Sequence, residues 1–217
     1  MKSKIAFILL ILNILISCKE KNAPVLSYWP DGILKSELHY TDGKLDGLCR
    51  WYYSNGKPSM EASYKMNVLD GESTRWYENG NIEEKAYYVN NQYDGVVEEY
   101  NVFGTLVKKT TYKNGVLNGM FYQYYDDGKL FLEGEYLDGM MQGSWIMYYK
   151  DGNVGSSAYY DKGTGVQKGY SEGGLYQNAE IHYKNNVKDG EETHFNMDGS
   201  VKEVLIWEDG NYIGTRR

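Results

Sequence analysis

One period governs this chain, because a glycine in a turn-forming context returns about every 24 residues. The eight anchor glycines, separated by 24, 24, 24, 24, 24, 22 and 25 residues, are Gly32, Gly56, Gly80, Gly104, Gly128, Gly152, Gly174 and Gly199. A fixed period of this length is the signature of a repeat array, in which each unit is too short to bury a core alone and packs against its neighbours. Residues 26–217 are therefore expected to form eight copies of one unit.

Aromatic residues keep the same period at two further positions, and tyrosine alone supplies 23 residues. Four residues before the anchors stand Tyr28, Tyr52, Trp76, Tyr100, Tyr124, Tyr148, Tyr170 and Phe195. Eight residues after the anchors stand Tyr40, Tyr64, Tyr88, Tyr112, Tyr136, Tyr160, then His182 or Tyr183 where one residue is inserted, and Trp207. We interpret the first set as a structural aromatic column that points into the packed side of the fold, since rings on neighbouring units supply the burial that one hairpin lacks.

The turns identify the unit as a β-hairpin. Asp or Asn precedes most anchor glycines, and such pairs tolerate positive φ in tight hairpin loops. The flanking runs, such as LCRWYYS and KPSMEASYK, have strand composition and no helical periodicity. The second turn, for example KNGVLNG at 113–119, is expected to be a longer loop that joins hairpin to hairpin. The predicted fold is all-β, an elongated single-layer antiparallel β-meander or solenoid of about eight 24-residue hairpin repeats.

The amino terminus has the pattern of a secretory signal, since Lys2 and Lys4 precede IAFILLILNILI. That run of 12 residues is shorter than the roughly 20 that a membrane-spanning helix needs. The ending LISC resembles the bacterial lipoprotein box, in which the peptidase cuts before a cysteine that receives a diacylglycerol thioether. We expect cleavage of residues 1–17, lipidation of Cys18, a lipidated linker at 18–25 and a repeat domain at 26–217. The alternative is an ordinary signal peptide with an incidental cysteine.

The charge balance restricts the partners. The net charge is −7, and removal of Lys2 and Lys4 makes it −7 − 2 = −9. Such a surface repels nucleic acid and anionic head groups, so membrane attachment would rest on acyl chains. The expected location is the bacterial cell envelope, with a lipid anchor at the outer membrane or cell surface. No disulfide is expected, because Cys49 has no partner once Cys18 is modified.

The sequence shows no metal, cofactor or nucleophile motif. Zinc ligand spacing is missing around the three histidines, His39, His182 and His194. Cys49 occupies a slot filled elsewhere by Val97, Phe121 and Trp145, which favours a small core residue over a nucleophile. Carboxylates recur five residues after the anchor, at Glu37, Glu61 and Glu133. They would lie about 10 Å apart, one hairpin from the next, which favours a solvated sheet face; a hydrolase is the weaker alternative.

The succession of an aromatic, a small polar residue, Asn/Asp-Gly, then Tyr and xxG resembles the MORN-repeat variant family of bacteria over residues 26–217. The resemblance implies an elongated antiparallel meander of hairpins and brings no catalytic set. Some members are labelled antitoxins of toxin–antitoxin pairs. Repeats six and seven depart from the pattern, since Gly152 to Gly165 is 13 residues and Gly174 to Gly190 is 16, which leaves their register open.

Four tyrosines follow a column aromatic directly and so lie on the opposite side of the strand. These candidates for a binding face are Tyr53, Tyr77, Tyr125 and Tyr149. The predicted function is a non-enzymatic envelope lipoprotein that acts as a repeat-based protein-binding scaffold, with the protein partner open. The alternatives are an antitoxin or immunity protein, and cell-surface glycan binding through the outward tyrosines.

Overall fold

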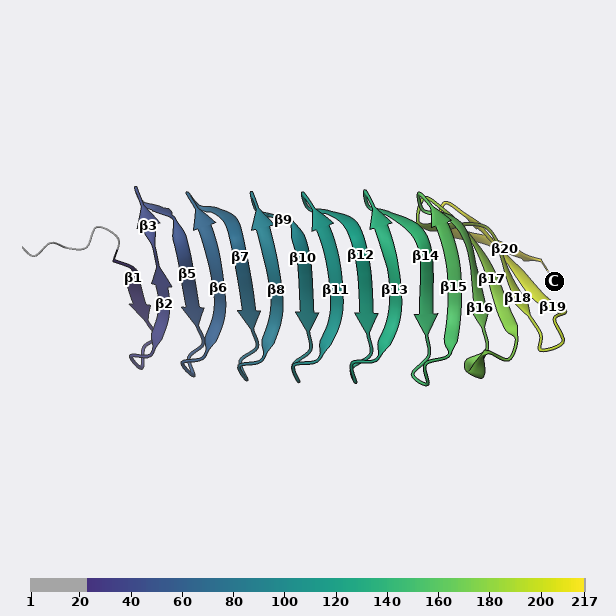
Figure 1. Ribbon diagram of the computed structural model, residues 1–217, viewed down its shortest axis with the longest axis horizontal. Coiled ribbons are helices and arrows are strands. Elements are labelled where there is room, and N and C mark those ends of the chain that lie inside the picture. Colours follow the sequence, from purple (N-terminus) through teal and green to yellow (C-terminus); the bar gives the residue numbers. More distant parts are fainter. Residues whose placement is uncertain (1–22, 217) are drawn as a thin grey trace, which may run out of the picture.

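The computed structural model describes residues 23–216, so the expected signal peptide, Cys18 and most of the 18–25 linker lie outside the described residues. Within 23–216, antiparallel hairpins stand side by side and form one long, twisted, open sheet (Figure 1). The all-β single-layer meander predicted from the repeat is confirmed. This part of the chain contains no helix long and apolar enough to cross a membrane.

Each hairpin has a first leg and a second leg. The first legs are β1 (Val25–Tyr28), β5 (Gly47–Tyr52), β7 (Val68–Trp76), β10 (Gly95–Tyr100), β12 (Val116–Tyr124), β14 (Met140–Tyr148), β16 (Thr164–Tyr170), β18 (Val187–Phe195) and β20 (Asn211–Arg216). The second legs are β2 (Leu34–Leu38), β6 (Pro58–Lys65), β8 (Ile82–Val89), β11 (Leu106–Lys113), β13 (Leu130–Leu137), β15 (Val154–Asp161), β17 (Gln177–Lys184) and β19 (Val201–Glu208). The short strands β3 (Tyr40–Thr41), β4 (Lys44–Leu45) and β9 (Gln92–Tyr93) extend three legs toward the second turns.

The second turns are tight, which corrects the expected longer loop. In the turn between β11 and β12, Asn114 and Gly115 both have positive φ, at 50° and 78°. Two such residues form the turn whose twist matches that of the flanking strands. The next glycine, Gly119, is not in the turn at all; it lies in β12 with φ 119°, where the pairing with β11 shifts register. The xxG signal therefore marks a β-bulge.

The anchor turns are the longer ones, which corrects the expected tight loop. In the second repeat the N–H of Tyr53 donates to the carbonyl of Lys57 at 2.9 Å, so three residues lie between them. Of the Asn55-Gly56 pair only Gly56 has positive φ, at 80°. The side chain of Asn55 instead accepts a hydrogen bond from the N–H of Lys57 at 2.9 Å. The Asn or Asp before the anchor thus acts as a side-chain acceptor inside the turn.

Repeats six and seven keep the hairpins but change the details. Strands β15 and β16 pair without a register shift, so the short spacing before Gly165 reflects a lost bulge. The anchor turn of repeat seven contains a 3-10 turn, η1 (Glu172–Gly174). In β17 the residue paired with Lys188 is Tyr183, just as Tyr112 of repeat four pairs with Leu117. Tyr183 is therefore the column member, and the insertion displaces His182.

The two faces of the sheet differ in burial. The face that we call the core face carries a row of buried residues near the middle of the legs, among them Cys49 and Ala62 at 0% exposure, Val97 at 2% and Trp145 at 6%. Cys49 is thus in the core, and the sheet register pairs it with Ala62. Rings of the second tyrosine set pack on this face, for example Tyr136 against Trp145 at 5.0 Å between centroids. Alternation along each strand places the first aromatic column on the opposite face.

Hydrogen bonds along both edges of the sheet tie each hairpin to the next. At the second turns a tip N–H donates to a carbonyl of the preceding repeat, as Gly115 does to Tyr93 at 2.8 Å. At the anchor turns a side chain spans the gap, as the hydroxyl of Tyr53 donates to the carbonyl of Trp76 at 2.6 Å. Neighbouring repeats are therefore fixed at three places: both edges and the strand ladder between them.

Candidate functional site

A second row of side chains crosses the core face, between the Cys49 row and the anchor turns. The strand register joins its members in the order Met60, Arg75, Glu84, Glu99, Lys108, Gln123, Leu132, Met147 and Ser156. The row is charged in repeats three and four and uncharged in repeats five and six. Two neighbouring cavities open along it and together form the candidate site, which we call the groove.

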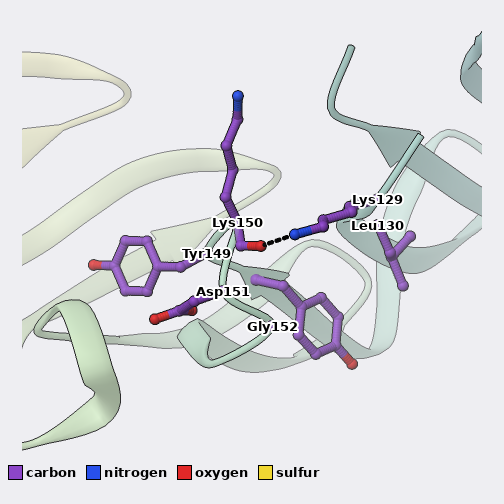
Figure 2. A pocket seen from close by; sticks show the side chains of 7 residues that line it. Lys129, Leu130, Tyr149, Lys150, Asp151 and Gly152 are labelled. Atoms are coloured by element: carbon purple, nitrogen blue, oxygen red, sulfur yellow. Dashed lines mark hydrogen bonds between the residues drawn. The ribbon is translucent and has the colours of Figure 1, made fainter. Parts of the chain in front are cut away.

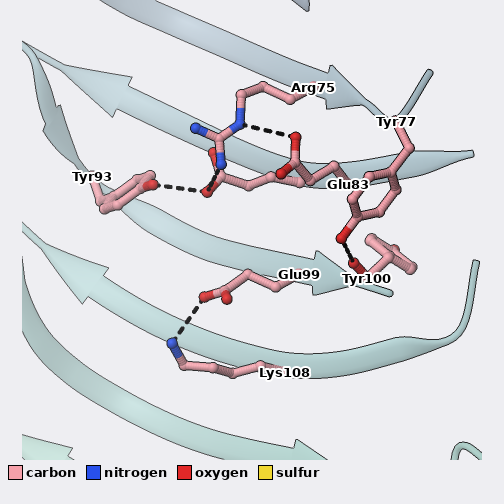
Figure 3. A network of polar contacts seen from close by, with 8 residues as sticks. Arg75, Tyr77, Glu83, Tyr93, Glu99, Tyr100 and Lys108 are labelled. Atoms are coloured by element: carbon pink, nitrogen blue, oxygen red, sulfur yellow. Dashed lines mark hydrogen bonds and ion pairs between the residues drawn. The ribbon is translucent and has the colours of Figure 1, made fainter. Parts of the chain in front are cut away.

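The charged half of the groove is built on Glu84, whose side chain is only 7% exposed. Arg75 Nη2 lies 3.2 Å from its carboxylate, and the hydroxyl of Tyr93 donates to the same oxygen at 2.9 Å (Figure 3). Burial, and then hydrogen bonds with Tyr88 and Glu84, raise the pKa of Tyr93 above its usual value. The buried carboxylate is thus paired on both sides, as a buried charge must be.

One repeat further along, Glu99 and Lys108 form an ion pair of 2.8 Å between paired positions of β10 and β11 (Figure 3). Burial, the largest single influence, lowers the pKa of Lys108, but the hydrogen bond with Glu99 and the negative charges of Glu99 and Glu84 together raise it above its usual value. This half of the groove has a volume of about 480 Å³. Its ionisable lining residues other than tyrosine are Glu83, Glu84, Glu99 and Asp126 against Arg75 and Lys108, a balance of −4 + 2 = −2.

The apolar half has a volume of about 450 Å³ and no charged residue in its lining. Leu132 and Met147 lie next to each other on β13 and β14, with the ring of Trp145 beside them. The wall is fixed by Asn186, whose side-chain amide donates to the carbonyl of Gly139 at 2.8 Å and accepts from the N–H of Met141 at 2.9 Å. These two bonds hold the second turns of repeats five and seven together around the cavity.

The four tyrosines predicted to form a binding face lie on the core face, at the anchor-turn side of the groove, and not on the side away from the core. Each hydroxyl donates to the carbonyl of the next column aromatic; the pairs are Tyr53 with Trp76, Tyr77 with Tyr100, Tyr125 with Tyr148, and Tyr149 with Tyr170. Tyr77 also lines the charged half, and Tyr125 packs against Phe131 of the apolar half at 5.1 Å between centroids. The four hydroxyls bridge neighbouring repeats, and the rings of Tyr77 and Tyr125 border the groove.

The first aromatic column lies on the opposite face among charged side chains, which corrects the expectation that it points into the core. The hydroxyl of Tyr100 donates to Glu98 at 2.9 Å. Burial and this hydrogen bond raise the pKa of Tyr100 to about 12. The hydrogen bond from Lys109 lowers the pKa of Glu98. Most members are half-buried, and Tyr28 at the first hairpin is 57% exposed.

The carboxylates considered as an acid–base pair take part in cross-strand contacts. Glu61 and Glu37 flank Arg50 at 2.6 and 3.6 Å, and Glu133 accepts a hydrogen bond from Tyr148 at 2.8 Å. His39 lies 2.6 Å from the carbonyl of Leu48. Within residues 23–216, no three His, Cys, Asp or Glu side chains gather as a metal site would require.

A smaller cavity of about 280 Å³ separates the anchor turns of repeats five and six. Figure 2 shows Lys129 reaching across it to the main chain, where its ammonium group donates to the carbonyl of Lys150 at 2.8 Å. The ammonium group of Lys150 lies 5.3 Å from the centre of the Tyr125 ring. These contacts fasten one turn to the next at the edge of the sheet.

Our sequence reasoning missed the groove because it followed the glycine and tyrosine columns. The signal was present five residues before each anchor, where Trp51, Arg75, Glu99, Gln123 and Met147 succeed one another. It was also present four residues after each anchor, where Met60, Glu84, Lys108, Leu132 and Ser156 do. Alignment of the repeats on the anchor glycine shows both columns changing from charged to uncharged at repeat five.

The fold and the groove together define a non-globular repeat protein built from open β-hairpins. Four segments match the family described as MORN repeat variant, at residues 21–42, 45–66, 69–90 and 117–138. Within the described residues, each matched segment corresponds to one hairpin, from the start of a first leg to a second turn. The MORN repeat is not a catalytic unit, and its repeats generally mediate interactions with proteins or membranes. Curated proteins provide no match to this chain.

Proposed function

We propose that this chain is a non-enzymatic scaffold that binds another protein in the groove on its core face. The observation that carries the proposal is the row from Arg75 to Met147, which sets a charged cavity beside an apolar one on one rigid face. Aromatic residues, Met and Arg are the side chains enriched in protein interfaces, and all three line this groove. The match to MORN repeats supports the same class of function.

We also propose that a lipid on Cys18 holds this scaffold at the bacterial envelope, on the evidence of the LISC motif. Replacement of Cys18 by Ser in the source cell should release the protein from the membrane fraction. Retention of the variant in that fraction would contradict lipid anchoring without touching the groove proposal.

A photo-crosslinking residue at Gln123 tests the groove in living cells. Gln123 lies in the row beside Leu132, whereas Tyr159, 66% exposed on the opposite face, serves as the control position. We expect one discrete protein adduct from position 123 and none from position 159, and we expect Leu132→Lys to remove it. No adduct from the groove, or the same adducts from both faces, would refute the proposal.

A further inference from the structure

The strand register fixes the distance between the two halves of the groove. Glu99 pairs with Lys108, Lys108 with Gln123, and Gln123 with Leu132, which is three steps across the sheet. At about 4.8 Å per step the separation is roughly 14 Å, and Met147, one step further, lies roughly 19 Å from Glu99.

The two halves select different chemical groups. The side chains of Glu83 and Glu99 are 38% and 41% exposed, and the lining of this half carries an excess of two negative charges, so it attracts a cation. Lys108 Nζ lies 2.8 Å from Oε1 of Glu99. The apolar half accepts a large uncharged side chain between Leu132 and Met147, since a charge there would lose its hydration without a counter-charge.

We propose, as an extension of the function proposed above, that the groove binds an extended segment of the partner protein with a Lys or Arg and a large apolar residue four to six positions apart. An extended chain advances about 3.4 Å per residue, so four to six residues span the roughly 14–19 Å between the halves. Gln123 lies between them, and its amide can both donate to and accept from the peptide main chain. A helix, at about 1.5 Å per residue, would need roughly nine to thirteen residues.

Synthetic peptides with one Arg and one Leu in a Gly/Ser background, separated by two to fourteen positions, test this spacing directly. We expect fluorescence anisotropy with the purified protein to show tightest binding at a separation of four to six and at least tenfold weaker binding at two or ten. An optimum near nine to thirteen would show a helical segment and overturn the proposal, and equal affinity at every spacing would overturn it as well.

Two variants test which half of the groove binds which side chain of the peptide. Met147→Lys should weaken the best peptide at least tenfold, whereas Tyr159→Lys on the opposite face should leave its affinity unchanged. Glu99→Gln should weaken the Arg peptide several-fold but leave the same peptide with the neutral isostere citrulline unaffected. Equal losses for both peptides would reveal a merely structural effect of Glu99 and refute the charged subsite.

The peptide experiment and the crosslinking experiment contradict different proposals when their results are negative. A groove-dependent adduct from Gln123, together with peptides that show no preferred spacing, would leave the scaffold function standing and remove the extended segment. The absence of both would remove both.

Discussion

Repeats two and six share one backbone plan but fill the same core slot with side chains of very different size. In repeat two, Cys49 lies opposite Ala62, and both are fully buried. In repeat six the slot holds Trp145, whose ring packs over Gly134 of the preceding repeat. A Cβ on Gly134 would lie 2.1 Å from that ring. The hairpin repeat therefore tolerates large changes of volume when the neighbouring strand compensates, and this freedom produces an apolar groove at one end.

Replacement of Trp145 by Ala should give the largest difference between the two repeats. Trp145 is 6% exposed, packs against Tyr136 and Phe121, and donates a hydrogen bond to the carbonyl of Glu135 at 3.2 Å. Removal of a buried ring of this size costs about 3–5 kcal/mol in free energy of unfolding. Cys49→Ala, the matched change in repeat two, should cost far less. Chemical denaturation measures both, and equal losses would show that repeat six is no more dependent on its slot than repeat two.

Gly134→Ala tests the compensation from the other side. The added methyl group overlaps the ring of Trp145, so we expect a loss of about 1–3 kcal/mol, whereas Gly214→Ala, with no atom within 4 Å, should be nearly neutral. Trp145→Val introduces the residue that repeat four carries as Val97. In a Trp145→Val background, where the overlapping ring is gone, Gly134→Ala should cost much less than it does beside the tryptophan. A double variant whose losses simply add would argue against direct coupling between the two positions.

The exchange of Cys49 for Trp145 also shows what the sequence could and could not predict. Periodic spacing was enough for the strands, the hairpins and the shared slot, because period and turn chemistry are local properties. The side of the sheet that forms the core could not be predicted in this way. Tyr52 and Tyr53 are both aromatic, and alternation along a strand does not tell which of the two points to the core. Which face forms the core depends on the residues paired on neighbouring strands, where small side chains such as Ala62 leave room for rings.

The predicted lengths of the two turns were wrong for a related reason. Both turns of a repeat contain Asn or Asp beside Gly, and composition does not tell a two-residue turn from a longer one. Only the φ values separate Asn114, which is left-handed, from Asn55, which uses its side chain as an acceptor. The groove itself depends on which rows of neighbouring repeats come into register, and this required the bulges at positions such as Gly119 to be known.

The tyrosine bridges at the anchor turns extend the comparison, since Tyr53 joins repeat two to repeat three and Tyr125 joins repeat five to repeat six. Tyr125→Phe keeps the ring against Phe131 but removes the hydrogen bond to the carbonyl of Tyr148, so we expect a loss of about 0.5–1.5 kcal/mol. Hydrogen exchange should speed up first around residues 148–154. Tyr159→Phe, at an exposed ring, is the control; comparable losses for both variants would mean that the bridge contributes nothing specific.

The smallest expected effect concerns charge on the opposite face, where repeat four pairs Glu98 with Lys109 and repeat six pairs Ile146 with Ser157. The hydrogen bond from Lys109 lowers the pKa of Glu98 below its ordinary value of 4.5, so the pair stabilises the fold above that value. This contribution is lost as the pH falls through the lowered pKa, because the protonated carboxyl no longer attracts the ammonium group. Glu98→Gln should therefore cost less than about 1 kcal/mol at neutral pH and nothing in strong acid. Denaturation curves across this range, with Ile146→Val as the pH-independent control, would contradict this account if the Glu98→Gln deficit persisted unchanged in acid.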